Sequence, residues 1–327
     1  MVYMPREGEH FEIPAGQPVF TFHSGPLYLL AGQVRYKLEN ESEPFFYTVG
    51  AGSLIGLEQS HMPPAMLKCN VLEPVRCLRW TLQGLETYLG KDIQFALIAL
   101  ISLSQQQRRL NQELARRAEA KALAMSQLKS MAEQNIQAGN AGMAQAIYQQ
   151  MVGTSPQHDL TASIREALAQ MKREQEGLGP LEVSTDMPSL NQETQLSLYQ
   201  LAFGGMGQLN EDILHRFGRN YAAGDCLCRE GDDGSELFLI LKGSVEASRK
   251  GQILGTSSEG ELVGEMAVLE GKPRSATVIA LSETITLALN REHFQMIFQL
   301  HPSWTWKLLE AFSHRIANCY QLLAREI

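Results

Sequence analysis

The chain has 327 residues, of which 44% are hydrophobic, and a formal net charge of −8 at pH 7. This length and apolar content suffice for two hydrophobic cores and a connecting segment. The acidic balance argues against a DNA partner, because DNA-binding proteins usually carry a basic footprint.

Signals for membrane insertion and metal binding are missing from the sequence. The longest strongly apolar run, residues 95–103, is too short to span a bilayer, and residues 1–7 contain no apolar signal region. The five cysteines have neither the spacing of a disulfide framework nor that of a zinc site. We therefore expect a cytoplasmic protein with free thiols, no membrane span and no metal.

Residues 1–90 contain short apolar stretches next to glycines. The clearest are Pro14-Ala15-Gly16, residues 28–34 (YLLAGQV) and residues 52–58 (GSLIGLE). Each recurs in the last third of the chain, two of them 208 residues later and residues 28–34 once a shorter hairpin is allowed for. Such self-similarity indicates a repeated structural unit.

A long helix is predicted from Asp92 to about Lys129. No glycine or proline interrupts this segment, and Ala, Leu, Gln, Arg and Glu dominate it. Its apolar positions leave gaps at Gln107, Arg117 and Lys121, so a coiled-coil seam is only partly present.

The same helix is basic between residues 108 and 129. That stretch could face membrane phosphates, nucleic acid or an acidic partner. A solvated helix face is the simpler interpretation, because Glu113 and Arg117 have the favourable i, i+4 spacing.

Apolar residues, several of them small, are spaced between residues 128 and 156 as in a helical hairpin. The pattern resembles a single tetratricopeptide repeat, and an ordinary hairpin explains it equally well. Its positions are Leu128, Met131, Ala132, Gly139, Ala144, Tyr148, Met151 and Pro156. We expect a third helix at residues 160–174 and, from the Gly, Pro, Ser and Thr content, a linker at residues 177–192.

The most informative segment is residues 260–278, GELVGEMAVLEGKPRSATV. Gly264 lets a ligand come close to the backbone, and the guanidinium of Arg274 can make two parallel hydrogen bonds to phosphate oxygens. Glu265 only accepts hydrogen bonds when ionised, which suits a hydroxyl donor such as a ribose 2′-OH. The segment predicts a sugar-phosphate site; the alternative is a turn whose arginine caps local carbonyls.

This segment resembles the phosphate-binding cassette of cyclic-nucleotide-binding domains. The family pattern Gly-Glu-x-Ala, followed by Pro-Arg-small-Ala-Thr-Val, stands here as residues 264–267 and 273–278. The resemblance implies that Arg274 holds the cyclic phosphate and that Glu265 takes the ribose 2′-OH. The ligand-binding set that it implies is Gly264, Glu265, Met266, Ala267, Arg274, Ser275 and Ala276, with base contacts expected from Val263, Thr277, Tyr320 and Leu323 and with Cys319 of the lid helix as a further candidate.

The flanks extend this resemblance to residues 208–324. Residues 237–245 look like a pair of barrel strands, and the helical spacing from Trp304 to Leu323 is similar to the family's lid helix, which folds over the base. We expect cAMP as the ligand and cGMP as the alternative. Relatives that prefer cGMP often have threonine where this chain has Ser275.

Residues 10–90 are interpreted as a degenerate copy of the same barrel. Gly52, in the stretch 52–58, stands 208 residues before Gly260. In that frame Leu57 replaces the cassette acid and Met66 replaces the arginine. Each lost charge-assisted contact is worth about 1.5–3 kcal/mol, so no cyclic nucleotide is expected here. We expect a docking or dimerisation surface; a barrel for a different ligand is the alternative.

The complete prediction is an α+β protein with two jelly-roll-like, cyclic-nucleotide-binding-type barrels joined by a long helical segment. Its expected domains are a degenerate barrel (1–90), the helical segment (91–176), the linker (177–192) and an intact domain (193–327).

No nucleophile motif, metal triad or carboxylate pair stands out, and few residues follow the lid helix, so we expect neither catalysis nor a DNA-binding helix-turn-helix. The predicted function is a cyclic nucleotide sensor that signals to a protein partner, through the helical middle or the first barrel, or to a second copy in a homodimer. The alternative is a structural adaptor that binds proteins independently of ligand.

Overall fold

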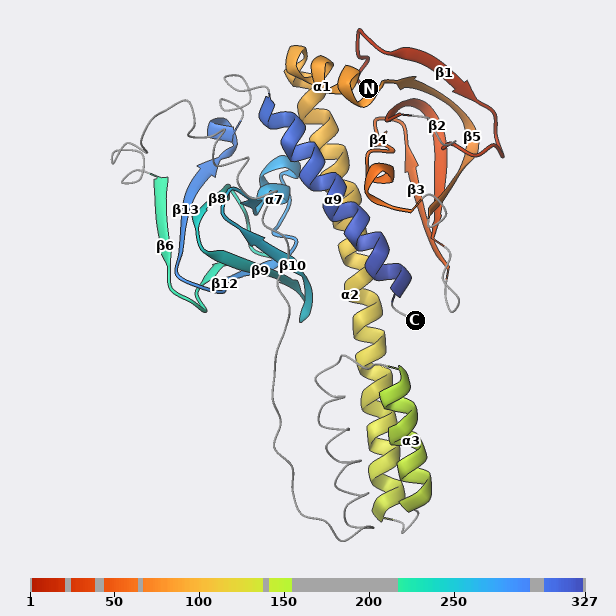
Figure 1. The fold of residues 1–327 in the computed structure, drawn as a ribbon, viewed down its shortest axis with the longest axis vertical. Coiled ribbons are helices and arrows are strands. Elements are labelled where there is room, and N and C mark those ends of the chain that lie inside the picture. Colours follow the sequence, from red (N-terminus) through yellow and green to blue (C-terminus); the bar gives the residue numbers. More distant parts are fainter. Residues whose placement is uncertain are drawn as a thin grey trace. The chain divides into compact units, whose positions relative to one another are not determined.

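The computed structural model describes residues 2–20, 25–38, 44–63, 67–137, 141–154, 217–294 and 303–325. The chain forms two compact units, one made of Met1–Ala115 with Gln192–Ile327 and the other of Arg116–Asn191. Helix α2 (Ile93–Gln137) begins in the first unit and ends in the second (Figure 1). The domain boundaries expected from the sequence stay a prediction, and the linker at 177–192 lies outside the described residues.

The first barrel is antiparallel throughout. It consists of β1 (Glu9–Ile13), β2 (Leu27–Leu38), β3 (Phe45–Gly50), β4 (Leu54–Ile55) and β5 (Leu67–Arg79), with the short 3-10 helix η1 (Glu58–His61) after β4 and α1 (Leu82–Lys91) after β5. The strand order is β1-β5-β2-β3, with β4 beside β2. Register shifts along the β2–β5 pair mark β-bulges, which bend these two long strands.

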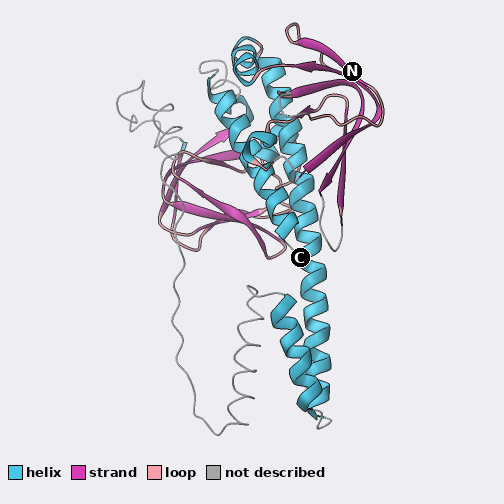
Figure 2. Cartoon of the chain, turned by 45° about the vertical axis from the view of Figure 1, so that its right-hand side comes forward, coloured by secondary structure: helices cyan, strands magenta, loops and turns pink. Residues whose placement is uncertain are grey.

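The second barrel consists of two four-stranded sheets, β10-β9-β12-β7 and β11-β8-β13-β6. Its strands are β6 (Gly218–Tyr221), β7 (Cys226–Cys228), β8 (Glu236–Lys242), β9 (Ser244–Arg249), β10 (Gln252–Ser258), β11 (Leu262–Val263), β12 (Thr277–Ala280) and β13 (Thr284–Asn290). Helix α7 (Glu265–Glu270) follows β11, and α9 (Ser303–Arg325) follows the barrel. The predicted α+β class with two jelly-roll-like barrels is confirmed (Figure 2).

Backbone geometry supports the predicted repeat. Corresponding glycines of the two barrels all have positive φ, a region that side chains disfavour: Gly16 and Gly224, Gly32 and Gly243, Gly52 and Gly260, Gly56 and Gly264. The amide of Gly52 donates to the Leu29 carbonyl, as the amide of Gly260 donates to the Ile240 carbonyl. Both barrels therefore use the same turns at the same points of the fold.

Helices α2 and α9 lie between the barrels in the first unit (Figure 1). The amide of Leu54 donates to the Ser102 hydroxyl at 2.9 Å, and the Gln106 amide donates to the Leu54 carbonyl at 2.8 Å, which holds α2 against the first barrel. On α9, Tyr320 contacts Tyr36 of the same barrel with ring centroids 6.1 Å apart. One apolar cluster runs from the first barrel through both helices to the second.

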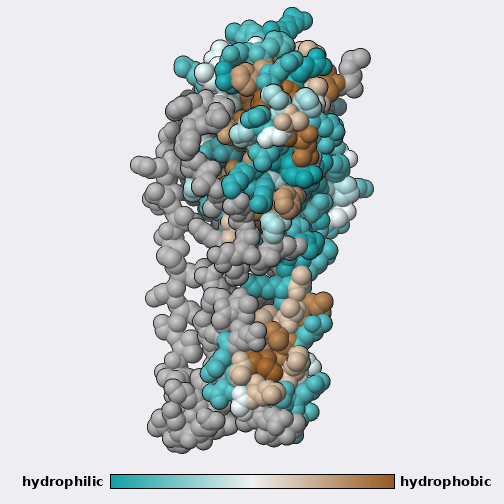
Figure 3. Space-filling model, turned by 90° about the vertical axis from the view of Figure 1, so that its right-hand side faces the viewer, coloured by the Kyte–Doolittle hydropathy of each residue, from teal (hydrophilic) through white to brown (hydrophobic). Residues whose placement is uncertain are grey.

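The second unit contains the predicted helical hairpin. The last part of α2 packs against α3 (Ala141–Thr154) around a small core of Met125, Ala132, Ala144, Tyr148 and Met151. Helix α2 continues to Gln137, beyond the expected end near Lys129. Figure 3 shows apolar side chains on this hairpin's surface, where Leu123, Met131 and Met143 are exposed. Pro156 and the expected third helix at 160–174 lie outside the described residues.

Two features are absent from the described residues. No described helix combines the length and the apolar character that crossing a bilayer requires. The same residues contain no group of His, Cys, Asp and Glu side chains that could hold a metal ion. All five cysteines are free thiols.

Candidate functional site

The site is built on the turn between β11 and α7. Gly264 has φ of 76° and immediately precedes the short helix α7. Gly271, which caps the C-terminal end of this helix, has φ of 62°. A Cβ on Gly264 would stand 2.6 Å from Nη1 of Arg274. Glycine is therefore required at position 264 for two reasons: the backbone there is left-handed, and the side chain of Arg274 approaches it closely.

Arg274 is held rigidly behind this turn. Its side chain is buried, with 7% of the residue exposed, and Nη1 donates to the Gly264 carbonyl at 2.9 Å. The guanidinium also lies over the Phe238 ring, 5.6 Å from the centroid. A guanidinium has five N–H donors and stays charged at any physiological pH, so it offers an anion a pre-positioned partner.

Glu265 is the first residue of α7 and is almost fully buried, with 3% exposed. Arg315 of α9 donates through Nη1 to Oε1 of Glu265 at 2.6 Å, and through Nη2 to the Leu262 carbonyl at 2.8 Å. The lid helix is thus tied directly to the cassette acid. A carboxylate has about four acceptor sites, so this contact leaves capacity for a hydroxyl.

A cavity of about 150 Å³ opens between the cassette, the second barrel and two helices. The barrel and cassette contribute Cys228, Ala247, Leu254, Gly255, Thr256, Ser257, Val263, Gly264, Glu265, Met266, Ala267, Arg274, Ser275, Ala276 and Val278. Helix α2 contributes Gln107 and Asn111, and α9 contributes Arg315, Asn318 and Cys319. The cavity has a charged wall at the cassette and a wall rich in amides at the helices.

The structure brings the whole expected ligand-binding set, together with Val263 and Cys319, to this one cavity. The other three expected base contacts are not among its lining residues. The Thr277 hydroxyl accepts from the amide of Glu230 at 3.0 Å, and Tyr320 and Leu323 are buried in α9, with Tyr320 against the first barrel. These residue assignments stay predictions.

Sequence reasoning named Cys319 but missed the other residues that the helices supply, which are Gln107, Asn111, Arg315 and Asn318. Gln107 was noted only as a gap in an apolar helix face. Asn111 follows Gln107 at i+4, so the two share one face of α2. A polar pair at helical spacing within an apolar face is the signal that could have revealed them.

The two thiols of the cavity wall are neutral at physiological pH. Burial raises the pKa of Cys228 to about 11 and the pKa of Cys319 to about 12. The Cys319 thiol donates to Oδ1 of Asn111 at 3.2 Å. The formal charges that line the cavity are therefore those of Glu265, Arg274 and Arg315.

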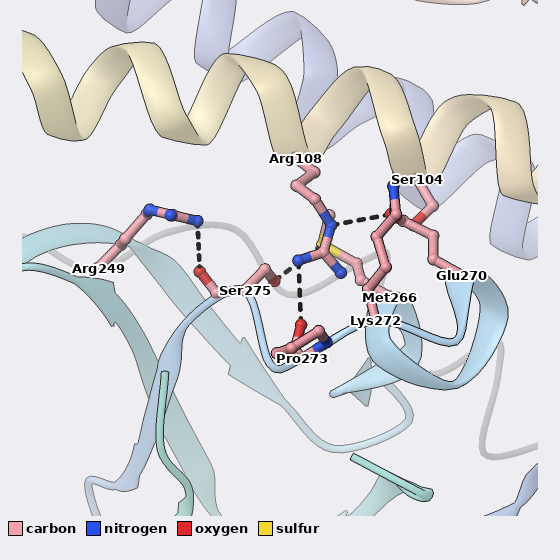
Figure 4. Close-up of polar contacts among 8 residues, drawn as sticks. All are labelled: Ser104, Arg108, Arg249, Met266, Glu270, Lys272, Pro273 and Ser275. Atoms are coloured by element: carbon pink, nitrogen blue, oxygen red, sulfur yellow. Dashed lines mark hydrogen bonds and ion pairs between the residues drawn. The ribbon is translucent and has the colours of Figure 1, made fainter. Parts of the chain in front are cut away.

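Helix α2 also binds the cassette from outside the cavity (Figure 4). The buried carboxylate of Glu270 accepts from Ser104 at 2.6 Å and from Arg108 Nε at 2.9 Å, and it pairs with Lys272 at 3.3 Å. Nη1 of Arg108 donates to the Pro273 carbonyl at 3.1 Å. The expectation of a solvated basic face is wrong for Arg108, because this side chain is an interior link between α2 and the cassette.

In the first barrel, the acid nearest to the corresponding turn is Glu58, and its carboxylate is hydrogen-bonded within the same barrel. Oε1 of Glu58 accepts from the Tyr36 hydroxyl and Oε2 accepts from the Gly56 amide, both at 3.0 Å. Burial raises the pKa of the Glu58 carboxyl. Leu57, at the position of the cassette acid, is buried, and Met66 lies outside the described residues. The acid near this turn is satisfied internally, which supports the interpretation as a degenerate site.

Fold and site together define a jelly-roll-like barrel in which the turn before α7 carries Glu265, faces Arg274 and is bound by α9 through Arg315. Residues 218–301 match the family model of the cyclic nucleotide-binding domain. The chain therefore carries a cyclic nucleotide-binding domain at these residues, as the cassette predicted.

The curated relatives are similar to about a quarter of this chain, and the chain spans less than a fifth of the length of either relative described here. A cGMP-dependent protein kinase of Caenorhabditis elegans is 39% identical over 77 residues, which are 24% of this chain and 10% of the kinase. A cAMP-dependent protein kinase regulatory subunit of Debaryomyces hansenii is 36% identical over 81 residues, 24% of this chain and 18% of that protein. The solved structure of cAMP-bound PfPKA-R is 13% identical to this chain, and the match covers 92% of this chain and 79% of that one, with a TM-score of 0.27.

Replacing Gly264 with alanine is expected to weaken both the fold and the binding of ligand. The left-handed backbone costs a residue with a side chain about 1–2 kcal/mol, and the new Cβ would displace Arg274. Gly251→Ala is the matched control, because Gly251 has φ of 80° and nothing within 4 Å of an added Cβ.

Chemical denaturation should show similar backbone penalties in the two variants, with an additional loss in Gly264→Ala. Titration with cAMP should show weaker binding in Gly264→Ala alone. Equal cAMP affinity in the two variants would contradict the role of Gly264 in positioning Arg274.

Proposed function

We propose that this protein is a non-catalytic cyclic nucleotide sensor, with cAMP as its ligand, that relays binding to a protein partner or a second copy of the chain. The observation that carries the proposal is the pair of buried, opposite charges, Arg274 and Glu265, on one cavity wall of a cyclic nucleotide-binding domain.

The chemistry of the cavity fits the three parts of such a ligand. A cyclic phosphate needs a charged, bidentate donor, which Arg274 supplies. The ribose 2′-OH needs an acceptor, which Glu265 supplies. The base then meets the remaining wall, formed by α2, α9 and the strand residues 254–257.

The contacts of the two helices support a relay. Arg315 of α9 binds the acid that would receive the ribose hydroxyl, and Arg108 of α2 binds the cassette helix at Glu270. The same two helices contact the first barrel at Leu54 and Tyr36. A ligand that changes the Glu265 or cassette contacts therefore acts on elements that reach the degenerate barrel, where a partner would bind.

Thermal unfolding with and without nucleotide tests the proposal. Because ligand binds only the folded state, a hundredfold excess over the dissociation constant should raise the free energy of unfolding by about 2.7 kcal/mol. We expect this shift with cAMP, a smaller one with cGMP at the same concentration, and none with 5′-AMP, which lacks the cyclic phosphate. The absence of any shift with either cyclic nucleotide would reject the sensor and leave the structural adaptor.

A further inference from the structure

One polar group on the helix wall of the cavity has an unused acceptor. Gln107 of α2 lines the cavity and is buried, with 8% exposed. Its Oε1 accepts no hydrogen bond from the described part of the chain. A buried amide without a partner is unfavourable unless something else satisfies it, and here the free space next to it is the cavity.

A second amide lies one turn further along the same helix. Asn111 lines the cavity and is 3% exposed. Its Oδ1 accepts from the Cys319 thiol, which fixes the side chain from α9. Gln107 and Asn111 thus present two amides from one face of α2 to the same cavity.

Amide side chains discriminate between purine bases. Gln and Asn pair in two-point fashion with adenine, donating to N7 and accepting from the 6-amino group, whereas the O6 and N7 edge of guanine pairs with a cation. The cavity cation on this side, Arg315, is already bound to Glu265 and the Leu262 carbonyl. The helix wall therefore favours an adenine over a guanine.

We propose that Gln107, assisted by Asn111, reads the 6-amino edge of the base. This rests on the proposed function and deepens it: base selectivity in the second barrel is supplied by a helix that the first barrel holds. Ser102 and Gln106, on another face of α2, bind Leu54 of the first barrel and so set the position of the reading face. The degenerate barrel then has a role in recognition without binding nucleotide itself.

The test measures dissociation constants for cAMP and for inosine 3′,5′-cyclic monophosphate, which carries an oxygen in place of the 6-amino group. The wild-type protein should prefer cAMP by about tenfold. Gln107→Met keeps the length of the side chain and removes its amide, so it should lose this preference while it still binds both nucleotides. Gln105→Met is the matched control, because Gln105 lies on the same helix and is exposed.

Each outcome of this experiment decides the proposal. Loss of the preference in Gln107→Met with an unchanged preference in Gln105→Met supports it. A wild-type preference in Gln107→Met overturns it and leaves the sensor function intact. Binding of neither nucleotide by the wild-type protein rejects the proposed function itself. The ratio of two constants measured on one sample is independent of the folded fraction, so partial unfolding of a variant cannot imitate the result.

Discussion

Replacing Arg274 with leucine is expected to lower the affinity for cAMP at least a hundredfold. The guanidinium is buried on the cavity wall and fixed by Gly264 and Phe238, so its donors are positioned before the ligand arrives. Charge-assisted hydrogen bonds contribute about 1.5–3 kcal/mol each, and two of them to one phosphate account for this loss. Calorimetric titration with cAMP measures it directly.

Two further variants serve as controls for the affinity lost in Arg274→Leu: one keeps the charge at this position, and the other removes an arginine elsewhere in the same domain. Arg274→Lys keeps the positive charge but not the planar fork, so it should recover part of the affinity. Arg219→Leu removes an exposed arginine of β6 and should bind as the wild-type protein does. Wild-type affinity in Arg274→Leu, with the fold intact by circular dichroism, would show that the phosphate is not held here.

Replacing Glu270 with alanine is expected to have the largest effect on stability. Its side chain is completely buried and paired with Arg108, whose own side chain is 12% exposed. Removing one partner of a buried ion pair costs about 3–5 kcal/mol, because the other charge is left without compensation. The free energy of unfolding from chemical denaturation should fall by about 3 kcal/mol, at the lower end of that range because Arg108 keeps the Pro273 carbonyl.

A double-mutant cycle shows whether this stability comes from the link between α2 and the cassette. Arg108→Ala combined with Glu270→Ala should cost clearly less than the sum of the two single changes, because the residues interact directly. Lys272→Ala is the matched control: Lys272 pairs with the same carboxylate but its side chain is 52% exposed, so its loss should cost less than about 1 kcal/mol. Strict additivity of Arg108→Ala and Glu270→Ala would contradict the link.

The cassette could be predicted from sequence because its chemistry is contiguous. Gly264, Glu265 and Arg274 lie within eleven consecutive residues, and the conformation of that loop is set by local features: a glycine at positive φ, a short helix and a nearby arginine. The repeat could be predicted in the same way, since three of the four pairs of turn glycines are 208 residues apart and the fourth, Gly32 and Gly243, is 211 residues apart. Local conformational preferences of this kind can be recognised in a single sequence.

The far wall of the site could not be predicted in the same way. Gln107 and Asn111 reach the cavity only because α2 packs between two barrels, and Arg108 meets Glu270 across 162 positions of the chain. The i, i+4 spacing of Gln107 and Asn111 indicates that they share a helix face, but it does not specify which other part of the protein that face contacts. The same limit led Arg108 to be interpreted as solvated, although it pairs with the buried carboxylate of Glu270.

By itself, the sequence determined the two barrels, the long helix and the residues suited to a phosphate and a ribose hydroxyl, because backbone geometry and side-chain charge at those positions are local properties. Only the tertiary structure decided which helices cover the cavity and which amides line it. That decision depends on the burial of one apolar cluster shared by the first barrel, α2, α9 and the second barrel. Its free energy is a sum over residues far apart in the chain, and no short segment encodes it.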